Sequence, residues 1–256
     1  MQMSSPIRSQ TQMTFFSGTS GLVLPGKKTS FPTEFRGKSR LAYYATLFNS
    51  LEVNSSFYKL PMAATVRKWA EETPGHFKFT FKISKTITQA KGLDFDPELV
   101  QQFMERIQQV GEKKGCLLIQ FPPSLSIEHL QRLEKLIKEI RKYDPNAQWK
   151  IAVEFRNSSW YTPDCYALLE KNHACLVSHD IPKSKIAPGI ITADFSYIRF
   201  HGEEGRYRGS YSLQELEQYA LDIRKLLAQH QTVYFYFNNT MGAALQNLET
   251  LNNFLK

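Results

Sequence analysis

The chain has 256 residues, 42% of them hydrophobic and 22% charged, and it carries a formal net charge of +8 at pH 7. These values are typical of a soluble globular protein, and a chain of this length buries a large core without disulfides or structural metals. The start of the chain lacks the apolar segment of a secretion signal, and no later run reaches membrane-spanning length. We therefore expect a cytoplasmic protein without a membrane partner. The three cysteines have no C-x-x-C spacing, which argues against a zinc site.

Strand-like and helix-like segments alternate from residue 13 to the end of the sequence. Strand patterns occupy residues 13–18, 50–58, 76–84, 116–121, 150–155, 175–180, 197–202 and 232–239. Helical spacing of apolar residues occupies 39–48, 64–73, 96–115, 126–143, 162–172, 212–230 and about 242–254. Asp96, Ser126 and Thr162 stand at the expected N-caps of three of these helices.

Eight strands that alternate with helices predict an α/β protein with a parallel sheet, and at this length a closed (β/α)₈ TIM barrel. We expect a single barrel domain over residues 13–256, preceded by a disordered or extended segment at 1–12. The sixth strand is followed by an irregular stretch, 181–196, that has no clear helical pattern. An open doubly wound sheet is the alternative, but no glycine-rich dinucleotide fingerprint follows the first strand.

Polar residues stand at the carboxyl ends of the predicted strands, where the active sites of TIM barrels lie. They are Glu52, Asn54, Lys82, Gln120, Glu154, Arg156, His179, Asp180, Arg199, His201, Asn238 and Asn239. Because unpaired ionisable groups are costly to bury, their convergence favours one solvated pocket. Glu154 with Arg156 could instead be a structural ion pair, and Lys82 could be an exposed strand end. His179 and Asp180 are adjacent and should point to opposite sides, so we expect only Asp180 to face the pocket.

These residue types favour an enzyme, a hydrolase, isomerase or lyase, that acts on a small anionic or phosphorylated substrate. Glu154 or Asp180 is the expected general base, and His201 is the expected acid or base near neutral pH. The remaining candidates are expected to bind the substrate. Lys82, Arg156 and Arg199 would bind its anionic group, Asn54, Gln120 and Asn238 would orient it, and Tyr58, Trp160 and Tyr211 would stack on it or pack the loops.

Two other functions are compatible with the same residues. The positive charge and the loop aromatics suit a protein that binds or processes nucleic acid, which would bind with strong salt dependence. A non-catalytic binding barrel would show the pocket without an arrangement of acid and base. The sequence does not predict the oligomeric state.

Several motifs in order along the chain resemble the family of domain of unknown function 72, the YecE-like proteins. They are "GTSG", "LFNSLEVNSSFYKLP", "LIQFPPS", "AVEFRNSSWY", "YIRFHG" followed by "YRGSYS", and "VYFYFNNTMGAALQNL". The resemblance runs from about residue 14 to the C-terminus and implies a TIM barrel, but it supplies no activity. One departure follows "GTSG", where the family usually has an aromatic-rich segment and this chain reads "LVLPGKKTSF".

The resemblance also suggests a fold-level likeness to xylose-isomerase-like and endonuclease-IV-like barrels, which hold divalent metals through histidines and carboxylates. In this chain the cations Lys82, Arg156 and Arg199 would crowd a metal ion. We therefore predict no cofactor and no metal site, with a divalent metal as the less favoured alternative.

Overall fold

The structure is a computed structural model that describes residues 15–229 and 231–256. Within these residues, nine strands pair in parallel throughout. The strands are β1 (Phe15–Thr19), β2 (Ser50–Val53), β3 (Lys78–Lys82), β4 (Lys114–Gln120), β5 (Lys150–Glu154), β6 (Ala174–Leu176), β7 (Ser178–His179), β8 (Phe195–Phe200) and β9 (Thr232–Phe237). One sheet has the order β1-β9-β8-β7 and the other the order β2-β3-β4-β5-β6. The predicted α/β fold with parallel pairing is confirmed.

The two sheets approach each other at two places. Ser20 forms a parallel bridge with Glu52, just beyond the end of β1. At the other place a single residue, Val177, separates β6 from β7, and its backbone N–H donates to the Val153 carbonyl at 2.9 Å. Gly18 permits the first approach, because a Cβ atom there would lie 2.1 Å from the Ser50 carbonyl oxygen.

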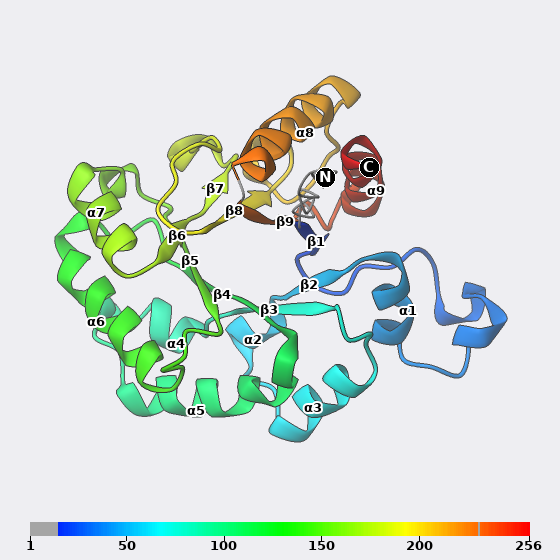
Figure 1. Ribbon diagram of the computed structural model, residues 1–256, viewed down its shortest axis with the longest axis horizontal. Helices are drawn as coiled ribbons and strands as arrows, with labels where there is room; N and C mark the ends of the chain where they lie inside the picture. The colour runs from blue at the N-terminus through cyan, green and yellow to red at the C-terminus, as the bar shows by residue number, and fades with distance from the viewer. Residues whose placement is uncertain (1–14, 230) are drawn as a thin grey trace, which may run out of the picture.

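Helices lie around the outside of the strands (Figure 1). They are α1 (Arg40–Leu47), α2 (Ser55–Tyr58), α3 (Ala63–Glu71), α4 (Lys85–Thr88), α5 (Pro97–Ile107), α6 (Leu130–Lys142), α7 (Pro163–Lys171), α8 (Leu213–Ala228) and α9 (Ala244–Leu255). Asp96 and Thr162 cap α5 and α7 through their side chains, as predicted. The cap predicted at Ser126 is wrong, because its side chain makes no capping hydrogen bond and a 3₁₀ turn precedes α6.

Side chains alternate between two apolar layers along the strands. One large cluster packs between strands and helices, and it includes Phe79, Leu117 and Val153. A smaller cluster comes from the other face of the strands: Cys116, Leu118, Ala152, Cys175, Val177, Phe195, Tyr197, Tyr234 and Tyr236. Two residues beyond Leu118, Ala152 and Tyr197, on the same face of the strand, stand the polar residues Gln120, Glu154 and Arg199. The polar site therefore lies directly above the smaller core.

One expected element differs in detail. The stretch 50–58 was expected to be extended throughout, but Asn54 adopts helical backbone angles and residues 55–58 form α2. The connection from β7 to β8 is irregular, as predicted, with a short 3₁₀ turn at Pro182–Ser184. The expectations for residues 1–12, and for the first two residues of the strand predicted at 13–18, lie outside the described residues. In the part of the chain that the structure describes, no helix has the length and apolar character needed to cross a bilayer.

Candidate functional site

A cluster of charged side chains occupies the carboxyl ends of strands from both sheets. We call it the strand-end cluster. Its members are Glu52 on β2, Lys82 on β3, Glu154 on β5, Arg156 just beyond β5, Arg199 on β8, His201 just beyond β8 and Asp180 just beyond β7.

Arg199 lies at the centre of the strand-end cluster and joins the two sheets. Its Nη2 donates to Glu52 Oε1 at 2.7 Å, its Nε donates to Glu52 Oε2 at 3.0 Å, and its Nη1 donates to Glu154 Oε2 at 2.7 Å. All three side chains are completely buried. Burial alone would raise the pKa of Glu52, but the charge and hydrogen bonds of Arg199 hold it below its usual value. Both carboxylates are therefore ionised and paired.

Glu52 has one further partner, which the sequence did not indicate as part of the site. The Tyr197 hydroxyl donates to Glu52 Oε2 at 2.5 Å. A signal for it was present, because Tyr197 stands two residues before Arg199 on β8 and so shares its face of the strand.

Arg156 and Glu154 form the ion pair that the sequence allowed, and the pair belongs to the strand-end cluster. Arg156 Nε donates to Glu154 Oε1 at 2.5 Å, and the side chain of Arg156 is 9% exposed while that of Glu154 is fully buried. Burial would raise the pKa of Glu154, but the charges of Arg156 and Arg199 hold it well below its usual value. Arg156 thus carries positive charge from the buried pair toward solvent.

His201 is a neutral hydrogen-bonding link in the strand-end cluster. Arg156 Nη2 and Arg199 Nη1 lie 3.1 and 3.2 Å from its Nε2. Since guanidinium groups can only donate, Nε2 accepts and the ring proton is assigned to Nδ1, which donates to Asp180 Oδ1 at 3.0 Å. Burial lowers the pKa of His201 to about 4, against the opposing effect of Asp180.

Asp180 and His179 both approach His201, although only Asp180 was expected to turn inward. Asp180 also accepts from the backbone N–H of His201 at 2.9 Å and from the Tyr211 hydroxyl. The His179 ring lies 5.8 Å from the His201 ring, and its Nε2 lies 3.0 Å from the Phe155 carbonyl oxygen. The alternation rule does not separate them, because β7 ends at His179 and Asp180 already belongs to the following loop.

Lys82 differs from the other cations of the strand-end cluster. Its Nζ lies 3.9 Å from the centroid of the Phe57 ring and makes no hydrogen bond or salt bridge with any residue in the ranges 15–229 and 231–256. Burial, followed by the charge of nearby Arg199, lowers the pKa of Lys82 to about 8. This partly buried amine therefore changes protonation state near neutral pH.

The amides and aromatics that were predicted to bind substrate have different surroundings in the structure. Tyr211 belongs to the site through Asp180. Asn54 Nδ2 donates to Asn238 Oδ1 at 3.5 Å, and Gln120 Nε2 donates to the Phe121 carbonyl at 3.4 Å. Tyr58 is 72% exposed on α2 and contacts Phe57 and Lys85 rather than the strand-end cluster.

Trp160 does not fulfil the expectation of a ligand-stacking ring. Its side chain is completely buried and stacks on Phe155 with ring centroids 4.5 Å apart. Its Nε1 donates to the Leu125 carbonyl at 2.7 Å. The chain turns back after β5, so this loop aromatic belongs to the outer apolar core.

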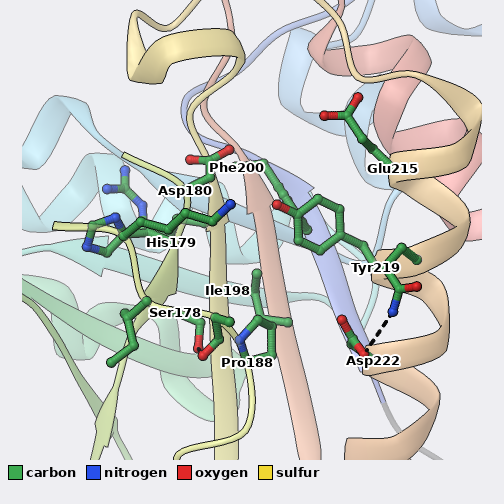
Figure 2. A pocket seen from close by; sticks show the side chains of 14 residues that line it. Ser178, His179, Asp180, Pro188, Ile198, Phe200, Glu215, Tyr219 and Asp222 are labelled. Atoms are coloured by element: carbon green, nitrogen blue, oxygen red, sulfur yellow. Dashed lines mark hydrogen bonds between the residues drawn. The ribbon is translucent and has the colours of Figure 1, made fainter. Parts of the chain in front are cut away.

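A groove of about 270 Å³ lies between α8 and the irregular connection that follows β7, and it adjoins the strand-end cluster because Asp180 and Arg199 are among its lining residues (Figure 2). Ile198 and Phe200 of β8 line it, and Tyr219 of α8 stands opposite Pro188. The two acidic groups that α8 contributes are already engaged within that helix: Glu215 accepts from the Ser212 N–H at 2.8 Å, and Asp222 accepts from Gln218 and Lys225. The third, Asp180, accepts from His201 and Tyr211 at the strand ends. The chemistry-bearing groups therefore concentrate in the strand-end cluster.

The described residues contain no group of three or more histidine, cysteine, aspartate or glutamate side chains placed to hold a metal ion. The three cysteines are free and buried. Burial raises the pKa of Cys175 to about 12, so its thiol stays protonated.

Fold and site together define an α/β protein with parallel sheets and charged residues gathered at the carboxyl ends of its strands. The chain belongs to the DUF72 family, described as proteins of unknown function, whose model matches residues 16–256. The UPF0759 protein YunF of Bacillus subtilis (strain 168) is 25% identical over 248 residues, which covers 83% of this chain and 84% of YunF. The UPF0759 protein YecE of Escherichia coli (strain K12) is 32% identical over 97 residues, which covers 38% of this chain and 36% of YecE.

Solved structures show the same fold. The crystal structure of a DUF72 family protein from Thermotoga maritima MSB8 has a TM-score of 0.76 and 26% identity, and covers 94% of this chain and 99% of that one. An AP endonuclease, family 2, from Brucella melitensis has a TM-score of 0.53 and 9% identity, and covers 90% of this chain and 96% of that one. At this identity the second likeness concerns the α/β fold alone.

Proposed function

We propose that the two sheets form the wall of one (β/α)₈ barrel and that the protein is an enzyme acting on a small anionic substrate at the barrel mouth. The Ser20–Glu52 bridge and the single residue between β6 and β7 support the first part. If β6 and β7 count as one interrupted strand, the nine described strands become eight, the number of strands in this type of barrel.

The observation that most supports an anionic substrate is the unpaired ammonium of Lys82. The three carboxylates of the strand-end cluster equal its three cations in number, but each carboxylate already accepts hydrogen bonds from other groups. No described carboxylate lies within salt-bridge distance of the Lys82 amine. A partly buried ammonium that no carboxylate contacts directly favours binding of an anion. Arg156, at the edge of the same cluster, supplies the second donor.

The roles within this proposal follow from which groups are already occupied. Glu154 was expected to act as a general base, but both of its oxygens accept from guanidinium groups, so it positions Arg156 and Arg199. His201 and Asp180 hold Arg156 in the same way, since His201 Nε2 accepts from that guanidinium. Lys82, with a pKa of about 8, is the proton-transfer group suited to neutral pH.

Binding of simple anions to matched variants tests this proposal. Calorimetric titration at pH 7 would use inorganic phosphate, phosphorylated sugars and small carboxylates, with the wild type, Lys82→Met and the control Lys85→Met. Lys85 lies three residues further along, on the exposed side of α4, so its variant retains the site. Loss of a charged hydrogen bond of about 1.5–3 kcal/mol predicts at least tenfold weaker binding by Lys82→Met.

Two results would contradict the proposal: no anion in the panel binds the wild type, or Lys82→Met and Lys85→Met bind as the wild type does. The other function expected from the net charge of +8, nucleic-acid binding or processing, has its own outcome. Salt-dependent retention on DNA or RNA, together with no binding of small anions, would favour it.

A further inference from the structure

Lys82 is placed as a reactive amine as well as a cation. It is the last residue of β3, and its side chain shares a strand face with Thr80, whose hydroxyl lies 2.8 Å from that of Tyr236 in the barrel interior. The Phe57 ring, which is only 6% exposed, covers one side of the Lys82 amine. No described side chain holds the amine through a hydrogen bond, so its lone pair is free when the group is neutral.

The charged groups that act on Lys82 come from three other strands. They are Glu52 from β2, Glu154 and Arg156 from the end of β5, and Arg199 from β8. Burial and Arg199 favour the neutral amine, while the two carboxylates favour a positive charge at the same place. At pH 7.5 a pKa of about 8 leaves roughly a quarter of the amine neutral, against about a thousandth for an ordinary lysine.

We propose that Lys82 Nζ forms a covalent imine with a carbonyl substrate that also carries a carboxylate or phosphate group. This inference rests on the proposed function and names the substrate class for the same site. The anionic group would bind Arg156, whose guanidinium reaches the edge of the strand-end cluster. The carbonyl carbon would then meet the amine beside the Phe57 ring.

The step balances without any other reactant. The neutral amine adds to the carbonyl carbon to form a carbon–nitrogen bond, and the carbonyl oxygen takes up a proton. Proton transfers then let that oxygen leave as water, so that ammonium plus carbonyl becomes iminium plus water. The iminium carries the same single positive charge as the ammonium, so Glu52 and Glu154 stabilise it in the same way. It acts as an electron sink for breaking a neighbouring carbon–carbon or carbon–oxygen bond.

Reductive trapping tests the imine directly. The full chain would be incubated at pH 7.5 with pyruvate, glyoxylate or dihydroxyacetone phosphate in the presence of cyanoborohydride, which reduces an iminium to a stable secondary amine. Intact mass and peptide mapping then locate the adduct. We expect one adduct per chain, at Lys82, in the wild type and in Lys85→Met, with a rate that rises through half its maximum near pH 8.

Lys82→Arg separates this inference from the proposed function. Arginine keeps the positive charge but is not a nucleophile at this pH, so this variant should lose the adduct at position 82 and still bind phosphate. Lys82→Met should lose both. The inference is overturned if the wild type binds anions yet gives no adduct at Lys82 with any carbonyl of the panel, or if surface lysines react as fast. Absence of anion binding in the wild type would instead contradict the proposed function.

Discussion

Replacing Arg199 by Met should destabilise the fold more than any surface change, because it removes the only cation that pairs with Glu52 in the described structure. The Arg199 guanidinium makes three hydrogen bonds to two carboxylates, and all these side chains are completely buried. Glu154 keeps Arg156 as a partner in the variant, but Glu52 keeps only the Tyr197 hydroxyl. Breaking a buried pair in this way costs about 3–5 kcal/mol of unfolding free energy.

Urea unfolding followed by tryptophan fluorescence measures this cost, since Trp149 and Trp160 are both completely buried. The matched control is Arg206→Met. Arg206 lies 3.0 Å from Glu204 in an exposed ion pair, so its loss should change the unfolding free energy by less than about 0.5 kcal/mol.

A double-mutant cycle identifies the cause of the destabilisation. In a Glu52→Gln background the buried negative charge is gone, so Arg199→Met should cost at least about 1 kcal/mol less than in the wild type. A cost below about 1 kcal/mol for the single variant, or an equal cost in both backgrounds, would refute the account of Arg199 as the central partner of two buried carboxylates.

Two further predictions concern neighbouring residues. Burial lowers the pKa of His201 from 6.5 to about 4, so between these pH values the unfolded chain takes up a proton that the folded chain does not. Protonation of this group should therefore lower the free energy of unfolding by about 2–3 kcal/mol between pH 7 and pH 4.5. In urea titrations over this pH range, the His201→Gln variant should show a correspondingly smaller fall in unfolding free energy. Parallel pH profiles of the two proteins would contradict this. Trp160→Phe should lower the unfolding free energy by about 1–3 kcal/mol, because it leaves space in the core and removes the donor to Leu125, while phosphate binding stays unchanged. Weaker phosphate binding by this variant at unchanged stability would contradict the prediction and indicate that Trp160 contributes to anion binding.

The pattern of the sequence predicts which strand ends carry charge because period-two alternation is a local property. Glu154 and Arg156 stand two residues apart on one extended segment, and the structure joins them by a hydrogen bond. The pairing of Arg199 with Glu52 joins residues 147 positions apart, and only the arrangement of the strands brings them together. The sequence therefore indicates the candidate residues but not their pairing.

The predictions that differ from the structure lie where the strands end. Asp180 follows the last residue of β7, so alternation no longer governs its direction and it reaches His201 together with His179. Trp160 lies in a 3₁₀ turn after β5 that returns the chain to the outer core. Lys82 was expected only as an anion-binding cation, since its altered pKa depends on burial and on Arg199, which local sequence does not reveal.

A crystal structure of the protein grown with inorganic phosphate would show directly whether Lys82 and Arg156 bind an anion. We expect phosphate at the carboxyl ends of the strands, within hydrogen-bonding distance of Lys82 Nζ and the Arg156 guanidinium, in the wild type and not in crystals of Lys82→Met. Phosphate absent from this position in the wild type, or found instead only in the groove between α8 and the connection that follows β7, would contradict this expectation.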